Sequence, residues 1–288
     1  MTTTAATTTT TATAEAALQH SAKPLAVITG ASTGIGLELG KQLAQNGYDL
    51  LLCANESLAA AASELTTLGA GVQSVQADLA EADGVQKLTD AVTATGKPVA
   101  ALCLNAGVGE SGPFVTTKLE DDLRLIDTNV VGTVRLAKHL VPAMVEQGQG
   151  RILFTSSVAS IAPAPNQALY GASKSFVQSF AEALRQELLE TGVTVTSLMP
   201  GPTDTNFFTR AALEHTALGA MKKDDPAQVA QQGIEAMLAG KEKVVAGSLL
   251  TRVQGQVAKA LPDSVKAAAQ GLLSAPGTAR KLPGFLKK

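Results

Sequence analysis

Short, almost continuous apolar runs alternate with longer stretches of helical periodicity through the middle of the chain. The runs are rich in Val, Ile, Leu and Ala, as expected for strands that are covered on both faces. Each intervening stretch is long enough for a crossover helix, and this strict alternation favours a parallel α/β sheet. We therefore predict a Rossmann-type, doubly wound parallel sheet of about seven strands with helices on both faces, a three-layer sandwich. The predicted strands are Leu25 to Thr29, Asp49 to Cys53, Val72 to Ala77, Val99 to Leu104, Ile152 to Thr155, Val193 to Leu198 and Lys243 to Ala246.

No tandem repeat or linker-like stretch divides this region, so residues 23–248 are predicted to form a single domain. Residues 1–22 consist mainly of Thr and Ala, with Glu15 and His20 among them. Such a segment has too little apolar bulk to offset the entropy of ordering it, so a disordered tail is predicted. It has neither the positive start and apolar stretch of a signal peptide nor the Arg of a mitochondrial presequence. A cytoplasmic protein is therefore expected.

Residues 249–288 are predicted to form a basic helical extension. From Thr251 onward, seven Lys and Arg residues stand against the single acid Asp263. Apolar positions at helical spacing on both sides of Pro262 predict two short amphipathic helices. We expect this extension to pack on the body or on a second subunit, and contact with an anionic membrane surface is the alternative. The apolar positions are Val253, Val257, Leu261, Val265, Ala269 and Leu272.

Composition excludes several classes of protein. A hydrophobic content of 45% with only 3% aromatic residues requires an aliphatic core, in which Cys53 and Cys103 are expected as reduced core residues. A net charge of −2 argues against a nucleic-acid-binding protein, whose phosphate contacts demand a basic face. No apolar run reaches the roughly 18 to 20 residues of a membrane span. No metal site is expected, because His20, His139 and His215 lack ligand spacing.

A glycine-rich turn follows the first predicted strand and opens a helix. It is Thr-Gly-Ala-Ser-Thr-Gly-Ile-Gly, residues 29–36. Gly30 supplies a tight turn, Gly34 lets the backbone approach a pyrophosphate, and Gly36 lets the helix pack closely on the strand. The phosphates would then lie at the helix N-terminus, which predicts a dinucleotide site.

A second group of residues carries acid–base chemistry. Tyr170 and Lys174 are spaced i, i+4 at the start of a predicted helix, so the phenol and the ammonium share one helical face. A neighbouring cation stabilises phenolate and lowers the pKa of a tyrosine, as a catalytic proton donor and acceptor requires. Ser157 lies just past the strand Ile152 to Thr155, where its hydroxyl is expected to reach the same pocket.

With these motifs in this order, residues 23 to about 247 resemble the classical short-chain dehydrogenase/reductase family. The Thr-Gly-x-x-x-Gly-x-Gly loop is complete, and Asn105-Ala106-Gly107 matches the family's Asn-Ala-Gly element, although Leu104 stands where a second Asn is usual. The resemblance identifies Asn129, Ser157, Tyr170 and Lys174 as the catalytic tetrad. It places the cofactor against Gly30, Ser32, Thr33, Gly34, Ile35, Gly36, Ala54, Asn55, Asp78, Leu79, Asn105, Ala106, Gly107, Tyr170, Lys174, Pro200, Gly201 and Thr203.

The resemblance implies an NAD(P)-dependent alcohol dehydrogenase or ketone reductase with Tyr170 as general acid and base. Ser157 would hold the substrate oxygen, Lys174 would bind the ribose and lower the pKa of Tyr170, and Asn129 would hold a water for proton relay. The acid that commonly selects NAD is replaced by Ala54, followed by Asn55 and Glu56 rather than Arg. NADP is therefore slightly favoured over NAD.

The substrate pocket is expected to be formed by the segment after Gly107, by residues 159–169 and by the loop of residues 202–223. Its apolar candidates favour an apolar carbonyl or secondary alcohol. A homodimer or homotetramer is implied by the resemblance only. The alternatives are a catalytically silent sensor or scaffold of the same fold, and a β-ketoacyl reductase, which would want a basic surface at the pocket mouth. The candidate lining residues are Val108, Phe114, Ile161, Leu169, Phe207 and Phe208.

Overall fold

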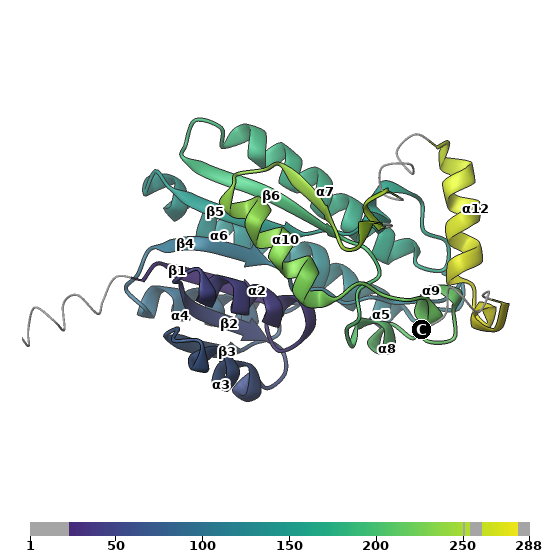
Figure 1. Ribbon diagram of the computed structural model, residues 1–288, viewed down its shortest axis with the longest axis horizontal. Helices are drawn as coiled ribbons and strands as arrows, with labels where there is room; N and C mark the ends of the chain where they lie inside the picture. The colour runs from purple at the N-terminus through teal and green to yellow at the C-terminus, as the bar shows by residue number, and fades with distance from the viewer. Residues whose placement is uncertain (1–22, 250, 254–260, 282–288) are drawn as a thin grey trace, which may run out of the picture.

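A computed structural model describes residues 23–249, 251–253 and 261–281. Its sheet has seven strands, all parallel, in the order β3-β2-β1-β4-β5-β6-β7 (Figure 1). This confirms the predicted fold class. Strands β2 and β3 are added on one side of β1, and strands β4 to β7 are added on its other side. The boundary between β1 and β4 is therefore the topological switch point, where such sheets bind ligands. The strands are β1 Leu25–Thr29, β2 Asp49–Ala54, β3 Val72–Gln76, β4 Val99–Leu104, β5 Gly150–Thr155, β6 Val193–Pro200 and β7 Lys243–Ala246.

Two layers of helices sandwich this sheet. Along β1, Leu25 and Val27 pack into one layer while Ala26 and Ile28 pack into the other. Because both sets are buried, the strand is apolar at every position rather than at alternate ones. One layer holds α4 Ala82–Ala94, α6 Gly132–Glu146 and α7 Ala168–Glu187, and the other holds α2 Gly34–Gln45, α3 Ala59–Thr67 and α10 Pro226–Leu238.

The core is aliphatic with few aromatic anchors. Phe154 is fully buried on β5 and packs edge-on against Phe180 of α7, with ring centroids 5.6 Å apart. Cys53 and Cys103 are free thiols in the core, as predicted, and burial raises the pKa of both to about 12. Neither is therefore a reactive thiolate at neutral pH.

Shorter elements gather at the carboxyl ends of the strands (Figure 1). The helix α5 Leu119–Ile126 runs through a π-helical turn, η1 Asp127–Val131, into α6. Asp225 caps α10 by accepting a hydrogen bond from the Ala227 N–H, with Pro226 at the first helical position. The remaining elements are η2 Val158–Ile161, α8 Phe207–Arg210, α9 Ala217–Ala220, α12 Asp263–Ser274 and η3 Thr278–Lys281.

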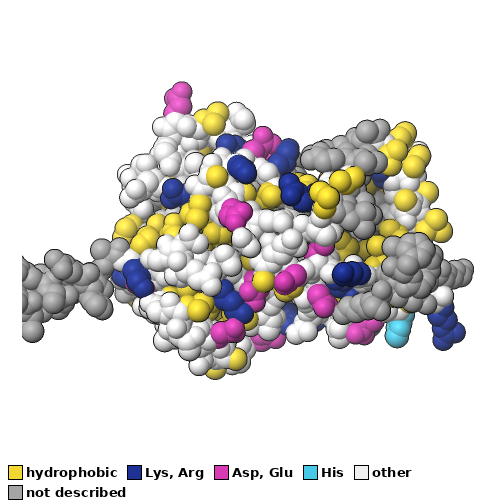
Figure 2. Space-filling view, in the orientation of Figure 1, with side chains coloured by type: hydrophobic (Ala, Val, Ile, Leu, Met, Phe, Trp, Pro, Cys, Tyr) yellow, Lys and Arg dark blue, Asp and Glu magenta, His cyan; other side chains and the backbone are white. Residues whose placement is uncertain are grey.

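The second of the two predicted C-terminal helices is present as α12; of its predicted apolar stripe, Ala269 lines the cavity but Val265 and Leu272 do not pack on the body. Val265 and Leu272 are 49% and 73% exposed, and Figure 2 shows hydrophobic side chains at the surface over this helix. The adjacent face packs instead, because Lys266 and Ser274 find backbone carbonyl acceptors there. The tail of residues 1–22 and most of the other predicted helix, which included Val257, lie outside the described residues.

Candidate active site

A cavity of about 880 Å³ opens at the carboxyl ends of the strands. Every residue that the sequence assigned to the cofactor lines it, from the glycine loop to the turn after β6. Ser157, Tyr170 and Lys174 line it as well, whereas Asn129 lies behind the wall with 1% of its surface exposed. The structure thus gathers residues from six different strand ends into one site.

Close backbone packing shapes the glycine loop. Gly30 and Gly34 adopt positive φ angles of 66° and 59°, which other residues rarely adopt. A Cβ on Gly36 would lie 2.0 Å from the Gly30 carbonyl oxygen, so only glycine fits there. Thr33 precedes α2 without a side-chain cap, which leaves backbone N–H groups of the first turn available to an anion. These features fit the pyrophosphate of a dinucleotide.

The Asn-Ala-Gly segment fixes this loop from the adjacent strand. The Thr29 hydroxyl accepts hydrogen bonds from the N–H groups of Asn105 and Ala106, both at 2.9 Å. The side-chain amide of Asn105 donates to the Thr29 carbonyl at 3.0 Å, and its Oδ1 accepts from the Thr155 hydroxyl at 3.0 Å. One side chain therefore ties the ends of β1, β4 and β5 together.

The three polar candidates meet where β5 ends and α7 begins. The Ser157 side chain lies close enough to the Tyr170 phenol to lower the pKa of that phenol, and both line the cavity. The Ser157 Oγ also accepts from the Ala159 N–H at 3.1 Å, which fixes the rotamer of the serine. Lys174 Nζ donates to the Thr155 carbonyl at 3.0 Å and lies 5.9 Å from the centre of the Tyr170 ring. The i, i+4 spacing thus places phenol and ammonium in one pocket.

Asn129 supports this group from the π-helical turn. Its Oδ1 accepts from the Val108 N–H at 2.8 Å, and its Nδ2 donates to the Val108 carbonyl at 2.9 Å and to the Ser173 hydroxyl at 3.0 Å. A Cβ on Gly107 would lie 3.1 Å from Lys174 Nζ and 3.2 Å from Asn129 Oδ1. Glycine at this position therefore lets both the lysine and the asparagine lie close to the backbone after β4.

Burial governs the proton affinities in this pocket. It raises the pKa of Tyr170 to about 12, against the lowering effect of the Ser157 side chain. It lowers the pKa of Lys174 to about 8. The pKa of Tyr170 therefore lies above its ordinary value, and not below it as expected, because desolvation of the phenolate dominates.

Two ion pairs at the rim were not predicted. Glu56, just past β2, accepts from the Ser32 hydroxyl at 2.6 Å and from Arg210 of α8 at 2.9 Å. Asp78, past β3, pairs with Arg124 of α5 at 2.8 Å. Both pairs join residues far apart in the sequence, so periodicity and motif spacing give no signal for them.

The substrate side of the cavity differs in part from the expected lining. Val108, Ile161, Phe207 and Phe208 line it, and the Phe207 ring lies 5.2 Å from that of Tyr170. Phe114 is 63% exposed, however, and neither it nor Leu169 contributes to the wall. Leu169 lies between Gln167 and Tyr170, which do line the cavity, so its segment is at the wall although the residue itself is not part of it. The C-terminal helix α12 supplies a part of the cavity wall that was not predicted from the sequence. Its lining residues are Lys266, Ala269, Gln270 and Leu273.

A carboxyl pair beside the cavity predicts a pH dependence of stability. Burial, the hydrogen bond to Asp122 and that residue's charge raise the pKa of Glu110 to about 7. Between the unfolded pKa near 4.5 and the folded pKa of about 7, the unfolded chain has released this proton while the folded protein still holds it. The free energy of unfolding therefore falls as pH rises through this range. Glu110→Gln is therefore expected to raise Tm by about 2 °C at pH 8 and to change it little at pH 5.

Thermal unfolding at the two pH values checks this prediction. Glu120→Gln, which removes the same charge from an exposed position on α5, serves as control. A lower Tm for Glu110→Gln than for the unmutated protein at pH 8 would contradict it.

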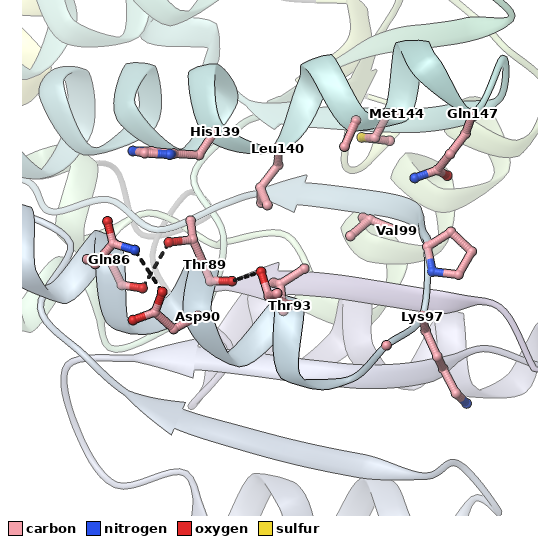
Figure 3. Close-up of a pocket in the computed structure, with 14 residues that line it drawn as sticks. Gln86, Thr89, Asp90, Thr93, Lys97, Val99, His139, Leu140, Met144 and Gln147 are labelled. Atoms are coloured by element: carbon pink, nitrogen blue, oxygen red, sulfur yellow. Dashed lines mark hydrogen bonds between the residues drawn. The ribbon is translucent and has the colours of Figure 1, made fainter.

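A second cavity, of about 320 Å³, lies between α4 and α6 (Figure 3). Thr89 and Asp90 of α4 face Leu140 and Met144 of α6 there, with the exposed His139 at its edge. It contains none of the predicted site residues. Within the described part of the chain, no three His, Cys, Asp or Glu side chains are grouped to hold a metal ion. None of the helices described there is long and apolar enough to cross a bilayer.

Comparison with known proteins identifies the family. Residues 24–215 match the model of the short chain dehydrogenases. An uncharacterized short-chain type dehydrogenase/reductase of Sinorhizobium fredii is 35% identical, covering 69% of this chain and 76% of that protein. A short-chain dehydrogenase from Sphingobium yanoikuyae, solved with NADPH, superposes with a TM-score of 0.74 at 29% identity, covering 87% of this chain and 95% of that one.

A second solved structure carries the other cofactor. A 3-oxoacyl-[acyl-carrier protein] reductase from Brucella melitensis, in complex with NAD, superposes with a TM-score of 0.70 at 28% identity, covering 80% of this chain and 98% of that one. The family model, the seven-stranded sheet and these relatives agree. The chain therefore belongs to the short-chain dehydrogenase/reductase family of nicotinamide-dependent oxidoreductases.

Proposed function

We propose that the protein is an NAD(P)-dependent alcohol dehydrogenase or ketone reductase in which Tyr170 exchanges a proton with the substrate oxygen. The observation that carries this proposal is that Ser157, Tyr170 and Lys174 line the same cavity, with the lysine ammonium 5.9 Å from the centre of the tyrosine ring. Two hydroxyls on one side of a cavity form a site for one carbonyl or alcohol oxygen.

Each polar residue has a separate task in this proposal. When bound, the nicotinamide supplies or accepts the hydride. Ser157 donates a hydrogen bond to the substrate oxygen and stabilises its developing charge, while Tyr170 gives it a proton in reduction and takes one in oxidation. Lys174 would bind the ribose hydroxyls. Asn129 fixes the segment after β4 and would hold a water that relays a proton to the lysine. The turn with Pro200, Gly201 and Thr203 faces the carboxamide.

The substrate class follows from the apolar walls. Phe207 packs against the Tyr170 ring, and Phe208 and Leu213 form a small apolar cluster with it in the segment after β6. Arg210 of the same segment is paired with Glu56, so its charge is partly neutralised. An apolar ketone or secondary alcohol suits this environment better than a phosphorylated sugar.

We propose NADP(H) or NAD(H) as cofactor, with the phosphorylated form slightly favoured because Ala54 cannot bind the ribose 2′-hydroxyl as an acid would. Asn55→Arg is expected to raise the ratio of kcat/KM for NADPH over NADH about tenfold, since a guanidinium beside the 2′-phosphate forms charge-assisted hydrogen bonds. Steady-state kinetics with both cofactors measure the ratio.

A matched control adds the same charge elsewhere: Thr66→Arg, exposed on α3, is expected to leave the ratio within about twofold. An unchanged ratio in Asn55→Arg would show that residue 55 does not face the ribose.

A catalytically silent sensor or scaffold is disfavoured. A protein that has kept this fold but does not catalyse a reaction has no need to retain the four polar side chains of the catalytic tetrad at their positions. Asn129, Ser157, Tyr170 and Lys174 are all present, buried or in the cavity wall, and three of them are fixed by specific hydrogen bonds. The arrangement therefore supports an enzyme.

A β-ketoacyl reductase remains the second candidate, and one observation favours it. The basic extension reaches the pocket, because α12 and η3 pack beside α9 and Lys266 lines the cavity. Lys266, although paired with Asp263, thus brings one basic group of the extension to the cavity, where an acidic carrier protein would dock. Turnover of a 3-oxoacyl thioester on its carrier, compared with the free ketone of equal chain length, separates the two functions.

We further propose a cytoplasmic homodimer or homotetramer formed through the long helices that carry the site residues. Leu123 on α5, Val134 on α6 and Phe176 on α7 are large apolar side chains that are 49%, 36% and 41% exposed. A second copy packed on these helices would cover them.

Oxidation of NADH and NADPH against a panel of ketones, aldehydes and diketones tests the proposed function. Reduction of apolar ketones with either cofactor is expected. Turnover confined to carrier-bound 3-oxoacyl thioesters would transfer the assignment to the second candidate, and cofactor binding without any turnover would favour the silent protein.

A further inference from the structure

One face of α12 is built into the catalytic cavity. Lys266, Ala269, Gln270 and Leu273 all line it, and their i, i+3, i+4, i+7 spacing makes them one continuous helical stripe. Figure 1 shows α12 at the same end of the molecule as α8 and α9. The basic extension is therefore part of the pocket rather than an appendage of the domain.

Hydrogen bonds hold this wall to the segment that leads into Tyr170. Lys266 Nζ donates to the Ile161 carbonyl at 3.0 Å, and the Ser274 hydroxyl donates to the Pro165 carbonyl at 2.6 Å. Ser274 is fully buried and also accepts from the Asn166 amide at 3.4 Å. Both ends of α12 are thus fixed against the residues that precede the catalytic helix.

The other edge of the wall is joined to the segment after β6. The Thr278 hydroxyl of η3 accepts from the Ala217 N–H at 2.8 Å, and the N–H groups of Gly277 and Ala279 donate to the His215 carbonyl at 3.1 and 3.3 Å. The helix α9 and α12 therefore hold a fixed spacing across the mouth.

Apolar side chains of both elements line the same part of the cavity wall. Leu218 and Met221 line it from the α9 side, and Ala269 and Leu273 line it from α12, which is in contact with α9. The Lys266 ammonium is occupied by Asp263 at 2.6 Å as well as by the Ile161 carbonyl, so it does not offer this part of the wall an unpaired charge. A chain of methylenes leaving the carbonyl at Tyr170 would find apolar surface on both elements.

We propose that α12 is the distal wall of the substrate pocket and selects ketones or secondary alcohols with one long apolar arm, which lies between α9 and α12. This inference rests on the function proposed above for the same site. The small side chain of Ala269 leaves room in the gap for the arm, and Leu273 supplies contact area for it. Each methylene that the wall covers is expected to raise kcat/KM about threefold.

The test uses the full-length, cofactor-loaded enzyme with methyl ketones of two-, four- and six-carbon arms. Leu273→Ala is expected to reduce the preference for the longest arm over the shortest about tenfold, with the shortest ketone changed less than about twofold. Ala269→Phe is expected to exclude the longest arm while the shortest is still reduced. Leu272→Ala is the matched control, because the neighbouring Leu272 is 73% exposed on the outer face.

Calorimetric titration of the same ketones gives a readout that does not depend on turnover. If Leu273→Ala and Leu272→Ala bind the series with the same dependence on arm length, α12 is not the selecting wall, even when the short ketone is reduced normally. If no ketone is reduced but affinity rises with arm length and falls in Leu273→Ala, the wall stands and the proposed reaction fails.

Discussion

Replacing Tyr170 with phenylalanine is expected to lower kcat for ketone reduction by about 10³-fold, with the affinity for cofactor changed little. The change removes the proton donor of the site and leaves the ring packed on Phe207. Because burial holds the pKa of the phenol at about 12, the side chain is a neutral donor throughout the physiological range. Steady-state turnover and equilibrium binding of NADPH separate the two effects.

The other tyrosine of the chain provides the control. Tyr48 is 7% exposed before β2 and does not line the cavity. Tyr48→Phe removes the same hydroxyl from a buried ring and is expected to retain full activity. Retained turnover in Tyr170→Phe would refute the assigned proton donor.

Replacing Gly36 with alanine is expected to destabilise the fold by about 3 kcal/mol and to abolish measurable cofactor binding. The added Cβ would lie 2.0 Å from the Gly30 carbonyl oxygen and 2.7 Å from the Asn105 amide nitrogen, and backbone cannot move aside cheaply. Relief of this clash displaces the first turn of α2 from β1 and so disrupts the phosphate site. A fall in Tm of about 6 to 12 °C is expected.

A glycine without such a neighbour calibrates the loss. Gly47 has a φ of 83° and nothing within 4 Å of its added Cβ, so Gly47→Ala is expected to cost only about 1 kcal/mol through backbone strain. Cofactor affinity is unaffected in that variant. Equal losses of stability in both would show that backbone conformation, rather than contact with Gly30, restricts residue 36.

Sequence alone predicted the sheet well because burial on both faces leaves a strong local signal. The runs Leu25–Thr29, Val99–Leu104 and Lys243–Ala246 have the predicted bounds. The other strands differ by one or two residues at an end, where polar or glycine residues such as Gly150 still join the ladder. Hydrogen bonding to a neighbouring strand, which hydropathy does not report, sets those ends.

The site was predictable as far as it depends on motifs. Fixed spacing in one helix brought Tyr170 and Lys174 together, and strand ends brought Ser157 beside them. The Glu56–Arg210 pair and the α12 wall depend on contacts between distant segments. In α12 the apolar stripe predicted that Val265 and Leu272 are buried, but both are exposed. The buried face is the one on which Lys266 and Ser274 donate hydrogen bonds to backbone carbonyl oxygens.

Transfer of deuterium from the C4 position of labelled NADPH or NADH to a ketone tests the central claim most directly. The account predicts that the alcohol product of an apolar methyl ketone carries one deuterium at the former carbonyl carbon, and that Tyr170→Phe slows its appearance about 10³-fold. Mass spectrometry of the product measures both. Oxidation of the cofactor without labelled alcohol, or equal labelling rates in the two proteins, would contradict it.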